Sequence, residues 1–180
     1  MNTCIQREVV NVVFAGLGGQ GVLKASDILS DAAFHAGHDV KKSEVHGMSQ
    51  RGGSVTSDVR YGGEVFSPMV PIGEAHVLVA LDGTQVAPAR HVLRDGGALI
   101  TPELLLKDGQ SVDDLDNDPS TQVNRRNLNV AMLGILSAHV DLAEEDWMFG
   151  LERNLPEKVH AQNKQVFSLG REVGSKMAKG

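Results

Sequence analysis

Four glycines fall within six residues near the start of the chain, in the segment Gly16-Leu17-Gly18-Gly19-Gln20-Gly21. An apolar, β-branched run precedes them and apolar residues at helical spacing follow, which predicts a strand, a tight turn and the start of a helix. Glycine adopts positive φ values at little steric cost, and the first N–H groups of a helix have no partner within it. These features are typical of a turn whose backbone binds a phosphate group.

The spacing Gly16-x-Gly18-x-x-Gly21 also matches the dinucleotide-binding fingerprint, in the strand–turn–helix context that it requires. The fingerprint includes an acidic residue at the end of the second strand, where it binds the ribose hydroxyls. The second predicted strand instead carries Lys41 and Lys42 at that point, and Glu44 is the nearest acidic residue that follows. The pattern therefore favours a phosphate-bearing ligand over NAD, and a glycine turn that serves packing alone stays open as the alternative.

A second unusual loop covers residues 46–54, with the sequence HGMSQRGGS. It combines an imidazole, hydroxyls, an amide and a guanidinium, and it follows a predicted strand, where α/β proteins place ligands. Glycines beside Arg51 would let backbone N–H groups and the guanidinium converge on an anion. The alternative is a surface loop in which Arg51 pairs with a carboxylate.

The strands and helices predicted on either side of these two loops indicate a Rossmann-like, three-layer α/β domain. The sheet is expected to be mainly parallel and to carry one antiparallel hairpin, which turns at Gly62-Gly63 and returns through residues 64–66. The last third is expected to be helical, with Asp141 capping its middle helix. No linker divides the chain, so residues 1–180 form one domain. The predicted strands are 9–15, 39–43, 54–61, 76–81 and 98–101, and the predicted helices are 21–36, 85–93, 129–140, one running to about residue 154, and 157–176.

Composition excludes several functions. The formal net charge of −6 argues against non-specific nucleic-acid binding, and no apolar run is long enough to span a membrane. The start of the chain is polar and unlike a signal peptide, so we expect a cytoplasmic protein. The single cysteine, Cys4, cannot supply the four thiolates of an iron–sulfur cluster, and no metal site is expected. Leu81-Asp82-Gly83 lacks the Gly-Asp-Gly signature of thiamine diphosphate and magnesium binding, so the chain looks like part of a larger enzyme.

Four segments, in this order, resemble the gamma-type subunit of 2-oxoacid:ferredoxin oxidoreductases. The sequence SEVHGMSQRGGSV at 43–55 is most similar to that of the beta subunit of indolepyruvate ferredoxin oxidoreductase. The resemblance covers about residues 9–170 and is weakest over 106–127, and the acidic segment 108–118 has no assigned role. The segments are AGLGGQGV at 15–22, the sequence at 43–55, FSP at 66–68 and NVAMLG at 129–134.

The resemblance implies a single pyruvate/ketoisovalerate oxidoreductase gamma-type domain in a hetero-oligomer. The holoenzyme of this family oxidatively decarboxylates a 2-oxoacid to an acyl-CoA and passes electrons to ferredoxin. A large partner subunit would carry the thiamine diphosphate, the Mg and the 4Fe-4S clusters, and this chain would not be catalytic alone. Its own role would be to contact coenzyme A. Carried over onto this sequence, the cofactor-binding residues are Gly18, Gly19, Gln20, Gly21, Arg51 and Gly52.

The sequence therefore leaves three interpretations of its function open. The first is a non-catalytic subunit of an indolepyruvate or arylpyruvate:ferredoxin oxidoreductase. The second is a stand-alone NAD(P)- or FAD-dependent reductase, which the missing acid after the second strand disfavours. The third is a scaffold subunit that binds no ligand, because glycine turns also occur for purely structural reasons.

Overall fold

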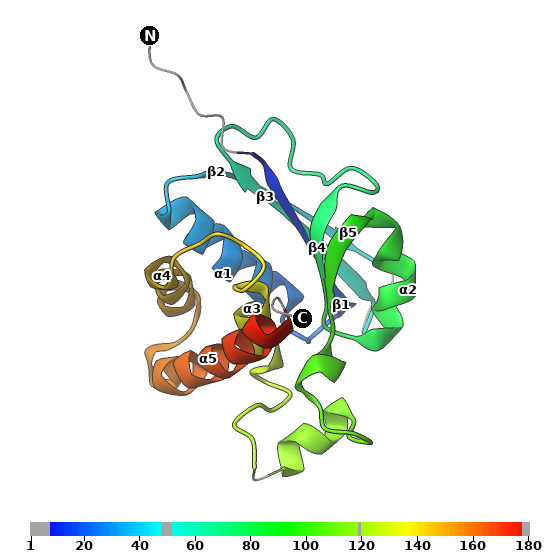
Figure 1. Cartoon of the computed structure of the whole chain (residues 1–180), viewed down its shortest axis with the longest axis vertical. Helices are drawn as coiled ribbons and strands as arrows, with labels where there is room; N and C mark the ends of the chain where they lie inside the picture. Colours follow the sequence, from blue (N-terminus) through cyan, green and yellow to red (C-terminus); the bar gives the residue numbers. More distant parts are fainter. Residues whose placement is uncertain (1–7, 48–51, 119, 178–180) are drawn as a thin grey trace.

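The computed structural model describes residues 8–47, 52–118 and 120–177. A five-stranded sheet in the order β2-β3-β1-β4-β5 forms its centre (Figure 1). The expected α/β class and the helical C-terminal part are confirmed. The strands are β1 (Val10–Leu17), β2 (Asp39–His46), β3 (Ser54–Gly62), β4 (Ala75–Ala80) and β5 (Leu93–Ile100).

The sheet is mixed, because β3 runs against both of its neighbours. β1, β4 and β5 pair in parallel, whereas β3 pairs antiparallel with β1 and with β2. The antiparallel hairpin is therefore β2–β3, and the expected return strand at residues 64–66 is wrong. The N–H of Val65 donates to the side chain of Asp39 at 2.8 Å rather than to a strand, and prolines at 68 and 71 lack the N–H that a ladder needs.

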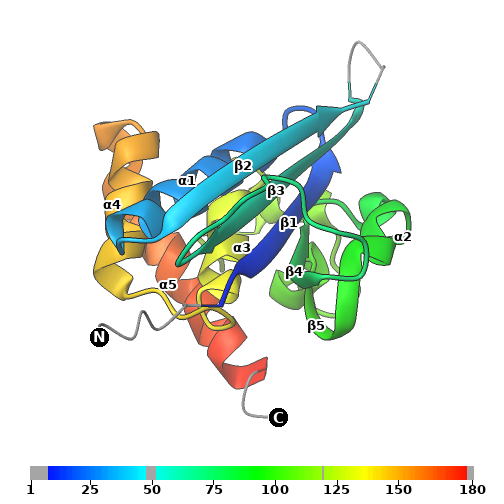
Figure 2. The same cartoon turned by 90° about the horizontal axis from the view of Figure 1, so that it is seen from above.

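Helices cover the two faces of the sheet unequally (Figures 1 and 2). On one face α1 and α3 lie against the strands, α4 packs on α1, and α5 packs on α3. Among the described residues, the helical cover of the opposite face consists of α2 and the adjoining 3₁₀ turns. These helices are α1 (Val22–His35), α2 (Val86–Ala89), α3 (Leu128–Leu136), α4 (Glu144–Asn154) and α5 (His160–Met177).

Two helix predictions need correction. The helix expected at 85–93 is only the four-residue α2 between 3₁₀ turns, and β5 begins at Leu93. A proline at position 88 lies inside this segment, and proline is tolerated only in the first turn of a helix. The middle helix of the last third is capped at Ala143 rather than Asp141, because the Ala143 N–H donates to the Asp146 carboxylate at 3.2 Å.

The α3–α5 crossing depends on glycines. A Cβ added at Gly170 would lie 1.9 Å from the carbonyl oxygen of Ala131, and one added at Gly134 would lie 2.1 Å from that of Phe167. The two backbones are therefore in direct contact, and α5 clamps the apolar α3 against the sheet. Within the described residues, no helix combines the length and the hydrophobicity needed to cross a membrane.

Candidate functional site

The glycine loop joins β1 to α1 at the carboxyl end of the strand. Gly19 and Gly21 have φ values of 93° and 80°, which explains why glycine occupies both positions. The side chain of Gln20 holds the loop: its Oε1 accepts from the Leu17 N–H at 2.7 Å, and its Nε2 donates to Asp82 Oδ2 at 2.8 Å. Gln20 thus ties the loop to the end of the neighbouring parallel strand β4, and any ligand contact by this side chain is additional to that role.

The glycine loop leaves the start of α1 open to a ligand. Gly21 is the N-cap residue, and none of the described side chains caps this helix end by a hydrogen bond. A Cβ at Gly21 would lie 2.5 Å from Asn129 Nδ2, which donates to the Gly21 carbonyl at 3.3 Å. By contrast, a Cβ at Gly19 would have nothing within 4 Å. The first N–H groups of α1 are therefore positioned to bind an anion, and the backbone at Gly19 can be approached closely.

The described end of the second loop, residues 52–54, lies against the glycine loop, as the sequence predicts. The N–H of Gly18 donates to the Gly53 carbonyl at 2.9 Å, and Ser54 pairs with Leu17 across the β1–β3 ladder. Gly52 has a φ of 64° and its N atom would lie 3.7 Å from a Cβ at Gly18. Arg51 lies outside the described residues, so its predicted contact with an anion stays a prediction.

A cavity of about 450 Å³ opens beside the glycine loop, and we call it the glycine-loop cavity. Two arginines that follow one another, Arg125 and Arg126, line it, and the sequence reasoning did not identify them. Both arginines follow the segment in which apolar residues show the weakest periodicity. The sequence signal that could have identified them is a pair of arginines immediately before a predicted buried helix. The residues that line the cavity are Gly19, Gln20, Leu81, Asp82, Gly83, Val112, Asp113, Arg125, Arg126 and Leu128.

Charges of both signs line the glycine-loop cavity. Arg125 pairs with Asp113 at 3.0 Å, and both side chains are well exposed. Hydrogen bonds from Thr84 and from Gln20 lower the pKa of Asp82 below its usual value, so this carboxyl is ionised at neutral pH. In the described part of the chain, no cluster of three or more His, Cys, Asp or Glu side chains could hold a metal ion.

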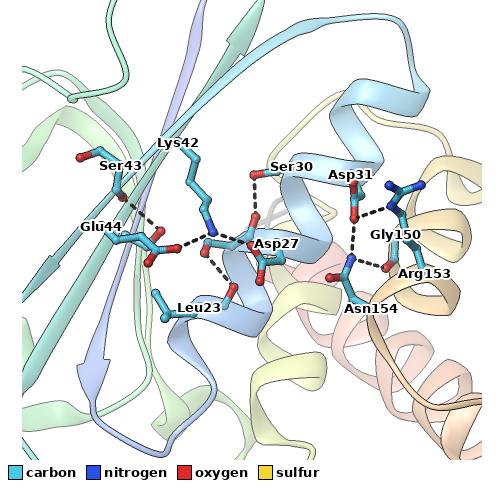
Figure 3. A network of polar contacts seen from close by, with 12 residues as sticks. Leu23, Asp27, Ser30, Asp31, Lys42, Ser43, Glu44, Gly150, Arg153 and Asn154 are labelled. Atoms are coloured by element: carbon cyan, nitrogen blue, oxygen red, sulfur yellow. Dashed lines mark hydrogen bonds and ion pairs between the residues drawn. The ribbon is translucent and has the colours of Figure 1, made fainter.

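The lysines of β2 are already paired with carboxylates, and Figure 3 shows the contacts of Lys42. Lys42 contacts Asp27 of α1 and lies 2.6 Å from Glu44, while Lys41 bonds Asp39 at 2.7 Å. Burial alone would lower the pKa of Lys42, but the bonds to Asp27 and Glu44 outweigh it and raise that pKa. These lysines therefore link β2 to α1 and neutralise nearby acids, so they add no free charge to the glycine loop.

The strand order explains why the dinucleotide fingerprint is incomplete. In that fingerprint the acid stands on a strand next to the first one, across the βαβ unit. Here the antiparallel β3 separates β2 from β1, and Glu44 lies on the edge strand β2, bound to Lys42. The geometry does not bring an acid of β2 to a ligand on the glycine loop.

Comparison with known proteins identifies the family. Residues 11–173 match the family described as pyruvate ferredoxin/flavodoxin oxidoreductase. The chain belongs to this family. The match includes the glycine loop, both arginines, helices α1 to α4 and most of α5, and it confirms the resemblance inferred from the four sequence segments.

Curated relatives within the family are named as indolepyruvate oxidoreductase subunits. The chain is 44% identical to such a subunit from Thermococcus kodakarensis over 51% of its own length, and that match spans 45% of the relative. The chain thus spans about half the length of the curated relatives that it matches at this identity. A subunit of the same name from Methanothermobacter thermautotrophicus is 29% identical over 89% of the chain and 95% of the relative.

Solved structures share the fold at low identity. A keto/oxoacid ferredoxin oxidoreductase gamma subunit from Geobacter sulfurreducens has a TM-score of 0.73 at 23% identity, covering 92% of this chain and 98% of that one. A 2-oxoglutarate:ferredoxin oxidoreductase chain from Magnetococcus marinus has a TM-score of 0.79 at 19% identity. The match covers 96% of this chain but 32% of that one, so there the same fold is one part of a longer polypeptide.

Proposed function

We propose that the chain is the gamma-type subunit of a cytoplasmic 2-oxoacid:ferredoxin oxidoreductase that uses indolepyruvate or another arylpyruvate. The complex would decarboxylate the 2-oxoacid oxidatively, form an acyl-CoA and pass the electrons to ferredoxin. Family membership and the names of the relatives support this proposal. The large partner subunit would hold the thiamine diphosphate, its Mg and the 4Fe-4S clusters, and the present chain would contribute binding rather than redox chemistry.

The open N-terminus of α1 carries the proposal that this chain binds coenzyme A. Gly21 precedes the helix without a side-chain cap in the described chain, and Gly19 borders a cavity that two arginines also line. An uncapped helix start with glycines beside it suits a pyrophosphate, because backbone N–H groups can donate to its oxygens. The structure of the Magnetococcus marinus enzyme was determined with coenzyme A and succinyl-CoA bound, which agrees with such a role for the shared fold.

The residues of this chain would bind and orient coenzyme A, which supplies the acyl-accepting thiol when bound. The N–H groups at the start of α1 would hold the pyrophosphate, and Gly18, Gly19 and Gly21 would let its oxygens approach the backbone. The bonds of Gln20 to Leu17 and Asp82 keep the loop in that shape before the ligand arrives. Such preorganisation reduces the entropy cost of binding.

Substitution of Gly19 tests the binding role. Gly19→Asp would place a carboxylate where the pyrophosphate is proposed to lie, and we expect it to weaken coenzyme A binding at least about tenfold in isothermal titration calorimetry. Gly37→Asp is the matched control, because Gly37 has a φ of 84° and its Cβ would also meet nothing within 4 Å. Both variants place an aspartate at a similar positive φ, so equal coenzyme A affinity in the two would refute the proposed site.

An exposed apolar surface supports a partner subunit. The side chains of Val45, Phe66, Met69 and Ile72 are 58%, 87%, 61% and 76% exposed. Val45, Met69 and Ile72 line one groove of about 360 Å³ on the sheet face that α2 covers. Exposed apolar side chains grouped in this way are typical of an interaction site, and we propose that the large subunit docks there.

The docking proposal can be tested by co-purification with the large subunit. Ile72→Ser should weaken the complex at least about tenfold, because burial of an isoleucine side chain contributes about 1.5–3 kcal/mol. Phe34→Ser is the control, since Phe34 is 70% exposed and lies on α1 instead. Unchanged co-purification of the Ile72 variant over a range of salt concentrations would exclude this face as the docking site.

A further inference from the structure

A second cavity, of about 530 Å³, lies beside the glycine-loop cavity, and Arg126 lines both. Its polar side chains come from the first turns of α1 and α3, the segment before α3, and α5. Buried asparagines are its distinguishing feature, so we call it the asparagine cavity. The polar side chains that line it are Lys24, Asn124, Arg126, Asn127, Asn129, Gln162 and Asn163.

The charge of the asparagine cavity differs from that of its neighbour. Lys24 and Arg126 contribute two positive charges, and none of the described residues that line this cavity is acidic. In the glycine-loop cavity, Asp82 and Asp113 offset the arginines. The net positive charge of the asparagine cavity therefore favours a phosphate monoester, which carries up to two negative charges, more strongly than the glycine-loop cavity does.

Helix dipoles add to this positive field. Lys24 stands in the first turn of α1, where a cation is normally unfavourable because the helix end is itself positive. Neither α1 nor α3 has an acidic residue in its first turn, although acids are preferred there. A bound anion would compensate both helix ends and both cations at once.

Amides and aliphatic groups complete the cavity. Asn129 and Asn163 are 7% exposed; the Asn163 amide donates to the Val159 carbonyl at 2.9 Å, and the Asn129 amide oxygen accepts from the Val130 N–H at 3.0 Å. An asparagine side chain offers two N–H donors and one carbonyl acceptor, so these bonds use part of that capacity. With Leu155 as an apolar wall, the cavity matches a phosphorylated nucleoside, which combines a charged group, a polar ring edge and a flat apolar face.

We propose that the asparagine cavity binds the phosphorylated adenosine end of coenzyme A, with Lys24 and Arg126 contacting the 3′-phosphate. This rests on the proposed function, in which the pyrophosphate lies on the glycine loop. Gly19 lines the glycine-loop cavity and Gly21 lines the asparagine cavity, so one extended ligand can follow the loop from the first cavity into the second. The same two cations would give the site its preference for a ligand that carries the additional phosphate.

Calorimetric titration of the full-length chain with coenzyme A and with dephospho-coenzyme A, which lacks the 3′-phosphate, tests this assignment. Wild type should bind coenzyme A at least about tenfold more tightly than dephospho-coenzyme A, because charge-assisted hydrogen bonds are lost with the phosphate. Lys24→Gln should reduce that preference to within about threefold and leave the affinity for dephospho-coenzyme A unchanged. Lys176→Gln, at an exposed position near the end of α5, makes the same charge change away from the cavity and should retain the full preference.

The outcomes separate this inference from the proposed function. A wild-type chain that binds neither ligand would overturn the proposed function, and the inference would fall with it. A chain that binds coenzyme A, with a preference that Lys24→Gln and Arg126→Gln leave intact, would overturn the inference alone. Equal loss of preference in the Lys176 control would assign the effect to net charge and also overturn it.

Discussion

The face of the sheet that α1 and α3 cover and the face that α2 covers bury very different amounts of apolar side chain. On the first, one continuous core includes Trp147, Phe167 and almost the whole of α3. On the second, six small or medium side chains form the buried cluster, and a groove with exposed apolar side chains lies beside it. The first face therefore supplies most of the buried apolar packing, whereas the second carries the groove at which we propose that the large subunit docks.

The candidate site belongs to the well-packed face. The glycine loop and both cavities lie where α1 and α3 begin, at the edge of the well-packed face. Packing beneath the loop, including the bond from Asn129 to the Gly21 carbonyl, fixes the position of the first turn of α1. We infer that ligand binding depends on the packed face and partner binding on the open one, and three predictions test this division.

The largest effect is expected at the helix crossing that seals the packed face. Gly170→Ala forces a Cβ to within 1.9 Å of the Ala131 carbonyl oxygen, so α5 must move away from α3. We expect a loss of about 3 kcal/mol or more in the free energy of unfolding, measured by urea denaturation. Ser168→Ala, on the exposed side of the same helix, is the control and should change it by about 0.5 kcal/mol or less.

Truncation of one aliphatic side chain on each face should lower the free energy of unfolding of the isolated chain by very different amounts. Leu133→Ala removes a fully buried side chain of α3 and should cost about 3 kcal/mol. Ile72→Ala removes a side chain that is 76% exposed and should cost about 0.5 kcal/mol or less until the partner is present. Similar losses in denaturation of the two isolated variants would show that the groove face also carries the fold.

The smallest effect concerns Asp58, which lies in the groove of the open face and accepts the Val70 N–H at 2.9 Å. Burial raises the pKa of Asp58, against the bond from Val70 and the charge of Arg60. A carboxyl with a raised folded pKa contributes stability below its unfolded pKa, and this contribution is lost as the pH rises through the folded pKa. Ionised Asp58 therefore destabilises the folded chain at pH 7.

Asp58→Asn removes that charge and keeps an oxygen that can accept from Val70. We expect the variant to melt at a higher temperature than wild type at pH 7, with the difference shrinking as the pH falls toward about 4. Melting curves of both proteins across this range provide the measurement. A difference that grows on acidification would mean that the carboxylate form of Asp58 is the stabilising one.

Several features could be predicted from the sequence because they depend on neighbouring residues. The glycine loop, the helix that follows it and the buried strands are encoded by local patterns of apolar residues and glycine. The sequences of the two loops also indicated the family, which the match over residues 11–173 confirms. The adjacency of the loops followed from a simple rule, since both come after strands that end at the same edge of the sheet.

The tertiary structure alone decided the strand order, the strands of the hairpin and the neighbours of the charged side chains. Strand pairing depends on long-range contacts, so nothing in residues 54–66 shows that β3 inserts between β1 and β2. The pairing of Lys42 with Asp27 and the meeting of Arg126 with Lys24 in one cavity likewise join residues far apart in sequence. The sequence by itself thus determined that a glycine turn joins a strand to a helix, and the packing of α1, α3 and α5 around it decided which side chains line the two cavities.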